Sequence, residues 1–283
     1  MASPCVGRDL AFGKPHAGRR RGVTLALVRR AGLIAAGVVG VVVLAGLGAW
    51  LMLFRDTAEP VTVEDAITSF RMEPEGSASA SPIPPGVYVY GTDGSESTDA
   101  LTGVTHRYPN RSTITVAAAD CGVSLTWRAL KGRSTEWRLC LTDGGWQLRA
   151  QDERHTFYGQ TERTTYICED TPILPARHPL GASWPVECAT DGATETGMAR
   201  IVARRPWRPV AGGRSRASVL VLKVTTFSGD IRGSARYAFW FDEVTGLPVR
   251  LDMASRTSNE SPVGDVHYRE DVVLRLLSLE PRR

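Results

Sequence analysis

From residue 87 to residue 280 the sequence alternates apolar and polar residues with a period of two, and this pattern restricts the fold more than any other. Successive side chains of a β-strand point to opposite faces, so the alternation indicates half-buried strands. We expect about 10–13 strands here, separated by Gly- and Asp-rich turns, and no long helix. Residues 266–279 alone fit either a buried strand or a terminal helix. The clearest alternating runs are Tyr237, Phe239 and Phe241, and Leu247, Val249, Leu251 and Met253.

The order of these runs predicts the fold class. Mostly sequential hairpins favour an antiparallel meander, closed as a barrel-like domain or folded as a sandwich. Residues 87–283 number about 195, which is enough for one hydrophobic core. The sequence therefore predicts a single, mainly β domain over 87–283.

An uninterrupted apolar segment, residues 31–54, precedes that domain and contains no charge and no proline. As a helix it would extend about 36 Å, enough to cross a bilayer core of about 30 Å. Residues 1–30 carry seven Lys and Arg and one Asp, and a basic flank stays on the cytoplasmic side. We therefore expect one transmembrane helix, a cytoplasmic tail and an extracellular C-terminal domain, with localisation at the cell membrane.

A cleaved signal peptide is the alternative for this segment. Its apolar core is normally about 7–15 residues and ends in small residues at the cleavage site. The run here is longer and ends in the bulky sequence 50–54, although cleavage after Ala49 stays open.

The charge distribution indicates what the outer domain does not bind. Residues 55–283 contain 27 Lys and Arg against 29 Asp and Glu, a formal charge of −2, so the pI of 8.9 comes from the tail. This balance argues against nucleic-acid binding.

Residues 55–86 form a connector between the apolar segment and the domain. Val63, Ala66, Ile67 and Phe70 fall on one helical face, which predicts a short amphipathic helix. Residues 73–86 are rich in Pro, Ser and Gly and predict a linker.

Four cysteines lie in the predicted outer domain, and a fifth, Cys5, lies in the tail. An even number in an exported domain indicates two disulfides, and four cysteines allow three connectivities. We favour Cys121 with Cys140 and Cys168 with Cys188. One observation counts against the first pair, because strand alternation places Cys140 on the face opposite to that of Val123 and Leu125. A metal or redox site is the alternative, but the CxxC spacing it needs is missing.

Motifs for catalysis are scarce, and the sequence predicts no catalytic residue, cofactor or metal site. It contains no Gly-rich phosphate loop, no G-x-S-x-G and no H-E-x-x-H. Glu153 and His155 fall on one face of a strand, an arrangement that suits acid–base work, but we interpret this pair as an exposed hairpin face of mixed charge.

Two compositional features suggest binding. Six tryptophans in the domain indicate a large aromatic core or, alternatively, an aromatic-lined cavity for a lipid or glycan. An arginine-rich segment around the Gly212-Gly213 turn is a candidate anion-binding site or, alternatively, a solvated loop. Its candidate residues are Arg204, Arg205, Arg208, Arg214 and Arg216.

The segments 86–92, 121–123 and 137–140 resemble those of uncharacterised actinobacterial single-pass membrane proteins with a β-rich extracellular domain. That resemblance implies no activity. Gly181 to Trp184 and the later Trp240 with Gly246-Leu247 are also similar to secreted β domains, some of which bind apolar ligands or lipoprotein-like cargo.

Together these features predict a membrane-anchored extracytoplasmic binding or scaffolding protein of the cell envelope, with a lipid, an anionic wall polymer or an envelope protein as partner. A hydrolase-like envelope enzyme is the alternative. An enzyme requires a cleft where a His meets carboxylates from distant strands. A lipid carrier requires a long apolar cavity, and a scaffold requires a filled core.

Overall fold

The computed structural model describes residues 56, 58–72, 81–177, 179–210, 215–261 and 264–283. The predicted cytoplasmic tail, the predicted transmembrane segment 31–54 and the signal-peptide alternative all lie outside these residues. Across the described ranges, the structure contains no helix with the length and apolar character needed to span a membrane.

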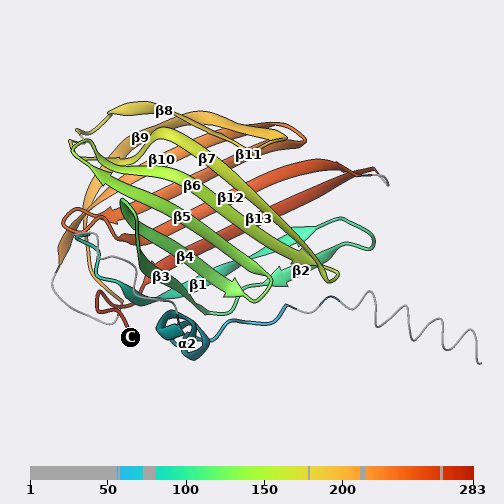
Figure 1. Cartoon of the computed structure of the whole chain (residues 1–283), viewed down its shortest axis with the longest axis horizontal. Helices are drawn as coiled ribbons and strands as arrows, with labels where there is room; N and C mark the ends of the chain where they lie inside the picture. The colour runs from blue at the N-terminus through green and yellow to red at the C-terminus, as the bar shows by residue number, and fades with distance from the viewer. Residues whose placement is uncertain (1–55, 57, 73–80, 178, 211–214, 262–263) are drawn as a thin grey trace, which may run out of the picture. The chain divides into compact units, whose positions relative to one another are not determined.

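The described residues form one helix and 13 strands (Figure 1). This confirms the expected number of strands, and residues 266–279 belong mainly to a strand rather than a helix. The elements are α2 (Val63–Met72), β1 (Gly86–Thr98), β2 (Val104–Arg107), β3 (Arg111–Ala119), β4 (Gly122–Leu130), β5 (Arg133–Thr142), β6 (Gly145–Phe157), β7 (Gln160–Pro175), β8 (Ser183–Ala189), β9 (Ala193–Trp207), β10 (Arg216–Gly229), β11 (Ile231–Asp242), β12 (Pro248–Ser261) and β13 (Gly264–Leu276).

The strands form an antiparallel meander that closes into a 12-strand barrel. The short β2 pairs only with β1 and is not counted in the ring. From β3 to β13 each strand pairs with its neighbours in the chain, and β13 returns to pair with β1 over Tyr90–Thr98. The opposite edge of β1 pairs first with β3 and then with the short β2. The structure thus selects the barrel over the sandwich.

Aromatic side chains fill the middle of the barrel. Tyr237, Phe239 and Phe241 stack along β11, with successive ring centroids 5.9 Å and 5.4 Å apart. The ring of Trp137 on β5 meets Phe239 edge-on at 6.1 Å, so side chains from opposite walls are in contact. Trp127 lies opposite Thr135, and Trp137 lies opposite Leu125, so the two tryptophans are diagonal neighbours on one face.

The connector packs on the barrel as well as linking to it. Thr62 and Asp65 cap the start of α2, each side chain bonding the backbone N–H of the other at 3.0–3.1 Å. α2 lies beneath β1 and β3, and its Ala66 is buried (Figure 1). Ile83, inside the predicted linker, joins the hydrophobic core, so the end of that segment is fixed.

Both favoured disulfides form, Cys121 with Cys140 and Cys168 with Cys188. Strand alternation had counted against the first pair. It does not apply to Cys121, because this residue lies in the turn before β4 and not in the strand. The second disulfide crosses a gap in the sheet. Over the described residues, Ile167 and Ala189 are the only register pair between β7 and β8.

The two ends of the barrel differ. The turns that follow β1, β6 and β10 lie at one end of the barrel (Figure 1). We call this the open end, because residues of this end line the cavity described below. At the other end the turn between β11 and β12 covers the interior. Gly246 in that turn has a φ of +77°, and a Cβ atom there would lie 2.3 Å from Trp146 Nε1.

Candidate functional site

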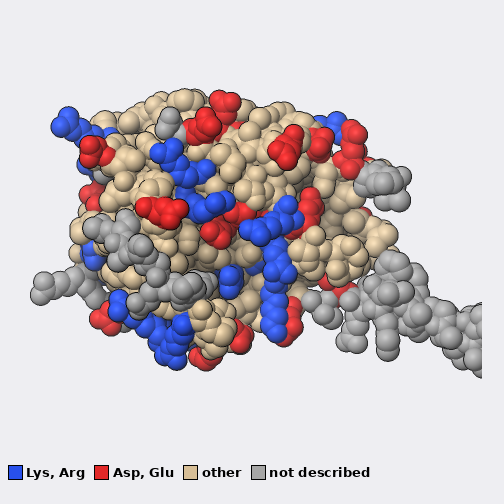
Figure 2. All heavy atoms as spheres, in the orientation of Figure 1, with Lys and Arg blue, Asp and Glu red and all other residues tan. Residues whose placement is uncertain are grey.

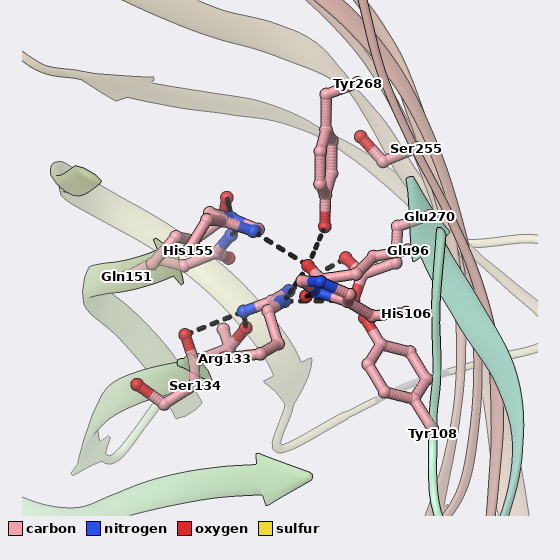
Figure 3. Close-up of polar contacts among 12 residues, drawn as sticks. Glu96, His106, Tyr108, Arg133, Ser134, Gln151, His155, Ser255, Tyr268 and Glu270 are labelled. Atoms are coloured by element: carbon pink, nitrogen blue, oxygen red, sulfur yellow. Dashed lines mark hydrogen bonds and ion pairs between the residues drawn. The ribbon is translucent and has the colours of Figure 1, made fainter. Parts of the chain in front are cut away.

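A fully buried arginine organises the interior below the open end. Arg133, at the start of β5, donates from Nε and Nη2 to the two carboxylate oxygens of Glu270 at 3.0 Å and 2.8 Å (Figure 3). Its Nη1 donates to the Ser134 carbonyl and the Thr135 hydroxyl. Burial opposes the charge, but Glu270 raises the pKa of Arg133 well above its usual value. Arg133 is thus permanently charged and fully engaged.

A second buried carboxylate, Glu96 of β1, lies beside this pair. Its Oε2 is 3.7 Å from Arg133 Nε and accepts a hydrogen bond from the Tyr268 hydroxyl at 3.0 Å. Its two oxygens also lie 3.3 Å and 3.2 Å from Nδ1 of His106 and of His155. Burial alone would raise the pKa of Glu96, but these histidines and Arg133 lower it to about 2.

The two histidines come from different strands and share Glu96. His106 of β2 also lies 3.1 Å from Asp56 through Nε2 and stacks on Phe157. His155 of β6 lies 3.6 Å from Glu153 through Nε2. The hydrogen bond with Glu96 raises the pKa of His106 despite burial. Burial and Arg133 oppose the charge of His155, yet Glu153 and Glu96 raise its pKa overall.

Glu153 faces the interior at the edge of this cluster. Its Oε1 accepts a hydrogen bond from Gln151 at 2.6 Å, and Gln151 in turn accepts one from Trp137. Burial raises its pKa, but His155, Arg133 and Gln151 lower it to about 2. The prediction of an exposed hairpin face for Glu153 and His155 is therefore wrong, since only 22% and 16% of their side chains are exposed.

A cavity of about 350 Å³ extends from the open end down to this cluster. Glu153, His155, Tyr268 and Glu270 form part of its floor, and the turns after β1 and β6 supply part of its rim. Its volume falls at the lower end of the range for ligand pockets, about 300–1,000 Å³. The aromatic residues of the lining are Phe157, Tyr158, Tyr166, Phe227, Tyr237 and Tyr268.

The aromatic lining is not the one considered from the sequence. The cavity is bordered by tyrosine and phenylalanine, whereas Trp127 and Trp137 belong to the filled core and Trp146 to the covered end. Among the described residues, no group of His, Cys, Asp and Glu side chains is arranged to hold a metal ion.

The described arginines of the arginine-rich segment lie at the other end of the barrel, near the end of β9 and the start of β10. Arg216 pairs with the buried Asp242 at 2.7 Å, and Arg204 lies 3.3 Å from Glu243. Arg205 and Arg208 are exposed, and Arg214 lies outside the described residues. On the face drawn in Figure 2, basic and acidic side chains are interspersed. Anion binding by this segment stays a prediction.

Strand parity is the signal that could have revealed the missed residues. Along β1, Glu96 is an even number of residues from the buried Tyr88 and Tyr90, so its side chain points to the same face. Along β13, Glu270 shares a face with the buried Val272 and Leu274 in the same way. A charged residue in phase with a core stripe predicts a buried charge with a partner. The same signal applies to Arg133.

Comparison with known proteins adds no assignment. A scan against protein-family models gives no match, and searches of curated proteins and of solved structures give no significant match either.

Proposed function

We propose that this chain is a membrane-anchored extracytoplasmic binding protein whose small amphiphilic or lipid-like ligand occupies the cavity at the open end of the barrel. The observation that carries the proposal is the coexistence of a filled core and an open cavity in one barrel. The interior is packed around Trp137 and Phe239, while about 350 Å³ above Glu153 and His155 is unfilled. A scaffold would not need this cavity.

The shape and lining of the cavity support a ligand of mixed character. Aromatic rings form the walls and ionised groups form the floor, which suits a molecule with an apolar body and one polar group. The arginine-rich segment supports the proposal less, because Arg204 and Arg216 already contact carboxylates.

Two features support the proposed location of the barrel outside the membrane. The apolar segment 31–54 behind a basic tail supports an anchor with the barrel outside. The two disulfides support an oxidising compartment.

Native mass spectrometry of the full chain, before and after organic extraction, tests the proposal. We expect an adduct that extraction removes. Replacing Thr257, which lines the cavity, with Trp should abolish the adduct. Ser258→Trp is the matched control, because the next residue of a strand points to the opposite face. An adduct that survives Thr257→Trp, or wild-type protein without one, contradicts the proposal.

A hydrolase-like enzyme is the second candidate, and one observation favours it. His155 of β6, which lines the cavity, lies 3.2 Å from Glu96 of the distant strand β1. However, both ring nitrogens of His155 already face carboxylates, so a free nitrogen for acid–base work requires rearrangement. Hydrolysis of aryl esters by the wild type, with loss in His155→Gln, would support this candidate over simple binding.

A further inference from the structure

The acidic side chains of the cluster outnumber the basic ones. Arg133, His106 and His155 supply at most three positive charges, even with both imidazoles protonated. Four carboxylates face them, those of Asp56, Glu96, Glu153 and Glu270. The cluster below the cavity therefore retains a formal charge of at least −1.

The excess negative charge is accessible from the cavity through Glu153. The other two carboxylates of the barrel wall, Glu96 and Glu270, are 1% and 2% exposed and are enclosed by their partners. Glu153 is 22% exposed and lines the cavity. A carboxylate has about four lone-pair positions, and Gln151 and His155 occupy two of them. Glu153 can thus accept further N–H donors from a ligand.

The walls around Glu153 suit a cation as well. The rings of Tyr166 and Tyr268 line the same cavity, and aromatic faces attract cations within about 6 Å. The barrel already contains such contacts. Lys223 Nζ lies 4.7 Å from the centroid of Tyr237, and the Arg133 guanidinium lies 5.1 Å from that of Trp127.

From this arrangement we infer that the ligand carries a protonated amine, which binds the Glu153 carboxylate while its apolar body lies against the aromatic walls. This inference rests on the proposed function and specifies the ligand class of the same cavity. An anionic ligand would instead place its charge against Glu153, with no free basic partner among the described lining residues.

The test compares three probes with the same apolar body: phenylbutylamine, phenylbutanol and phenylbutyrate. Their binding to the full chain in lipid nanodiscs is measured by isothermal titration calorimetry at neutral pH, with empty nanodiscs as the blank. We expect the amine to bind at least tenfold more tightly than the alcohol, and the carboxylate more weakly than both.

Two variants assign the effect to one residue. Glu153→Gln should remove most of the preference for the amine over the alcohol. Glu187→Gln, on the exposed outer face of β8, is the matched control and should retain the full preference.

The outcomes separate the two proposals. If the amine and the alcohol bind equally, or the carboxylate binds best, the cavity is a binding site but the inference is overturned. An amine preference that persists in Glu153→Gln overturns the role of Glu153. If no probe binds the wild type, the proposed function and the inference both fail.

Discussion

Glu96 and Glu270 stand directly opposite each other where β1 meets β13, as a register pair of two buried carboxylates at the closure of the barrel. Like charges in such positions repel each other. Arg133 reaches them from β5 and binds Glu270 through two hydrogen bonds (Figure 3). The closure of the barrel is thus coupled to one residue on another wall.

Removing Arg133 should destabilise the protein strongly. Arg133→Met leaves two buried carboxylates without their main counter-charge, and losing one partner of a buried pair costs about 3–5 kcal/mol. Chemical denaturation of the full chain measures the change in the free energy of unfolding. The matched control is Arg163→Met, whose side chain is 68% exposed and pairs with Asp152, and we expect about 0–1 kcal/mol there.

A double variant separates lost pairing from lost packing. Arg133→Met combined with Glu270→Gln removes both charges and should recover part of the loss. A double variant as unstable as the sum of the two single variants would contradict this account.

Stability should be greatest between about pH 4.5 and 6.5, the unperturbed pKa values of Glu and His. The pKa values of Glu96 and Glu153 are depressed, so their contributions are present above pH 4.5 and are lost as the pH falls towards about 2. The pKa values of His106 and His155 are raised. Their contributions are present below pH 6.5 and are lost as the pH rises through the raised values.

Thermal unfolding of the full chain between pH 3 and pH 9 measures this profile. The variant His106→Gln with His155→Gln should flatten the alkaline side and also weaken the acidic side, because the two histidines help to lower the pKa values of Glu96 and Glu153. A midpoint that rises steadily from pH 5 to pH 8 in the wild type would contradict the prediction.

The disulfide Cys168–Cys188 should be important for local stability. Besides one register pair, β7 and β8 are joined by this disulfide, by Thr171 bonding the Glu187 carbonyl, and by Trp184 bonding the Pro172 carbonyl. Replacing both cysteines with serine should speed hydrogen exchange in β7 and β8.

The disulfide Cys121–Cys140 is the control, because it closes a loop of similar length. Removing it should cost a similar global stability of about 3 kcal/mol. It should leave exchange in β7 and β8 unchanged, because β4 and β5 are joined by a long ladder of register pairs without the disulfide.

Gly246 should tolerate no side chain. Gly246→Ala combines a left-handed backbone with a collision against Trp146, and we expect a loss of about 2–5 kcal/mol. Gly159 offers a matched control, since its φ is +71° but a Cβ atom there meets nothing within 4 Å. Gly159→Ala should cost about 1–2 kcal/mol, the strain alone. Equal losses in denaturant unfolding would show that Trp146 contributes nothing.

Much of the fold could be predicted from local patterns. The period-two alternation predicted the meander, and the helical face of Val63 to Phe70 predicted α2. The choice between barrel and sandwich could not be made, because it depends on whether β1 reaches β13. The disulfide pairing was predictable because strand neighbours in a meander are also neighbours in sequence.

The site was less accessible to sequence reasoning. Glu153 and His155 were recognised as sharing a face, but whether that face points inward depends on closure of the sheet. Glu96 and His155 are 59 residues apart and meet only across the barrel. Arg133 follows a Lys-Gly turn, and the sequence around it resembles an ordinary solvated hairpin.

The closure between β1 and β13 also dictates an order of folding events. Glu96 and Tyr268 are 172 residues apart, whereas the other strand pairings join near neighbours. Local hairpins need little loop-closure entropy and form early, while the joining of the first and last strands is the slow step. The last strand must emerge from the ribosome before Glu96 leaves water, so the ionic cluster assembles at the end of folding.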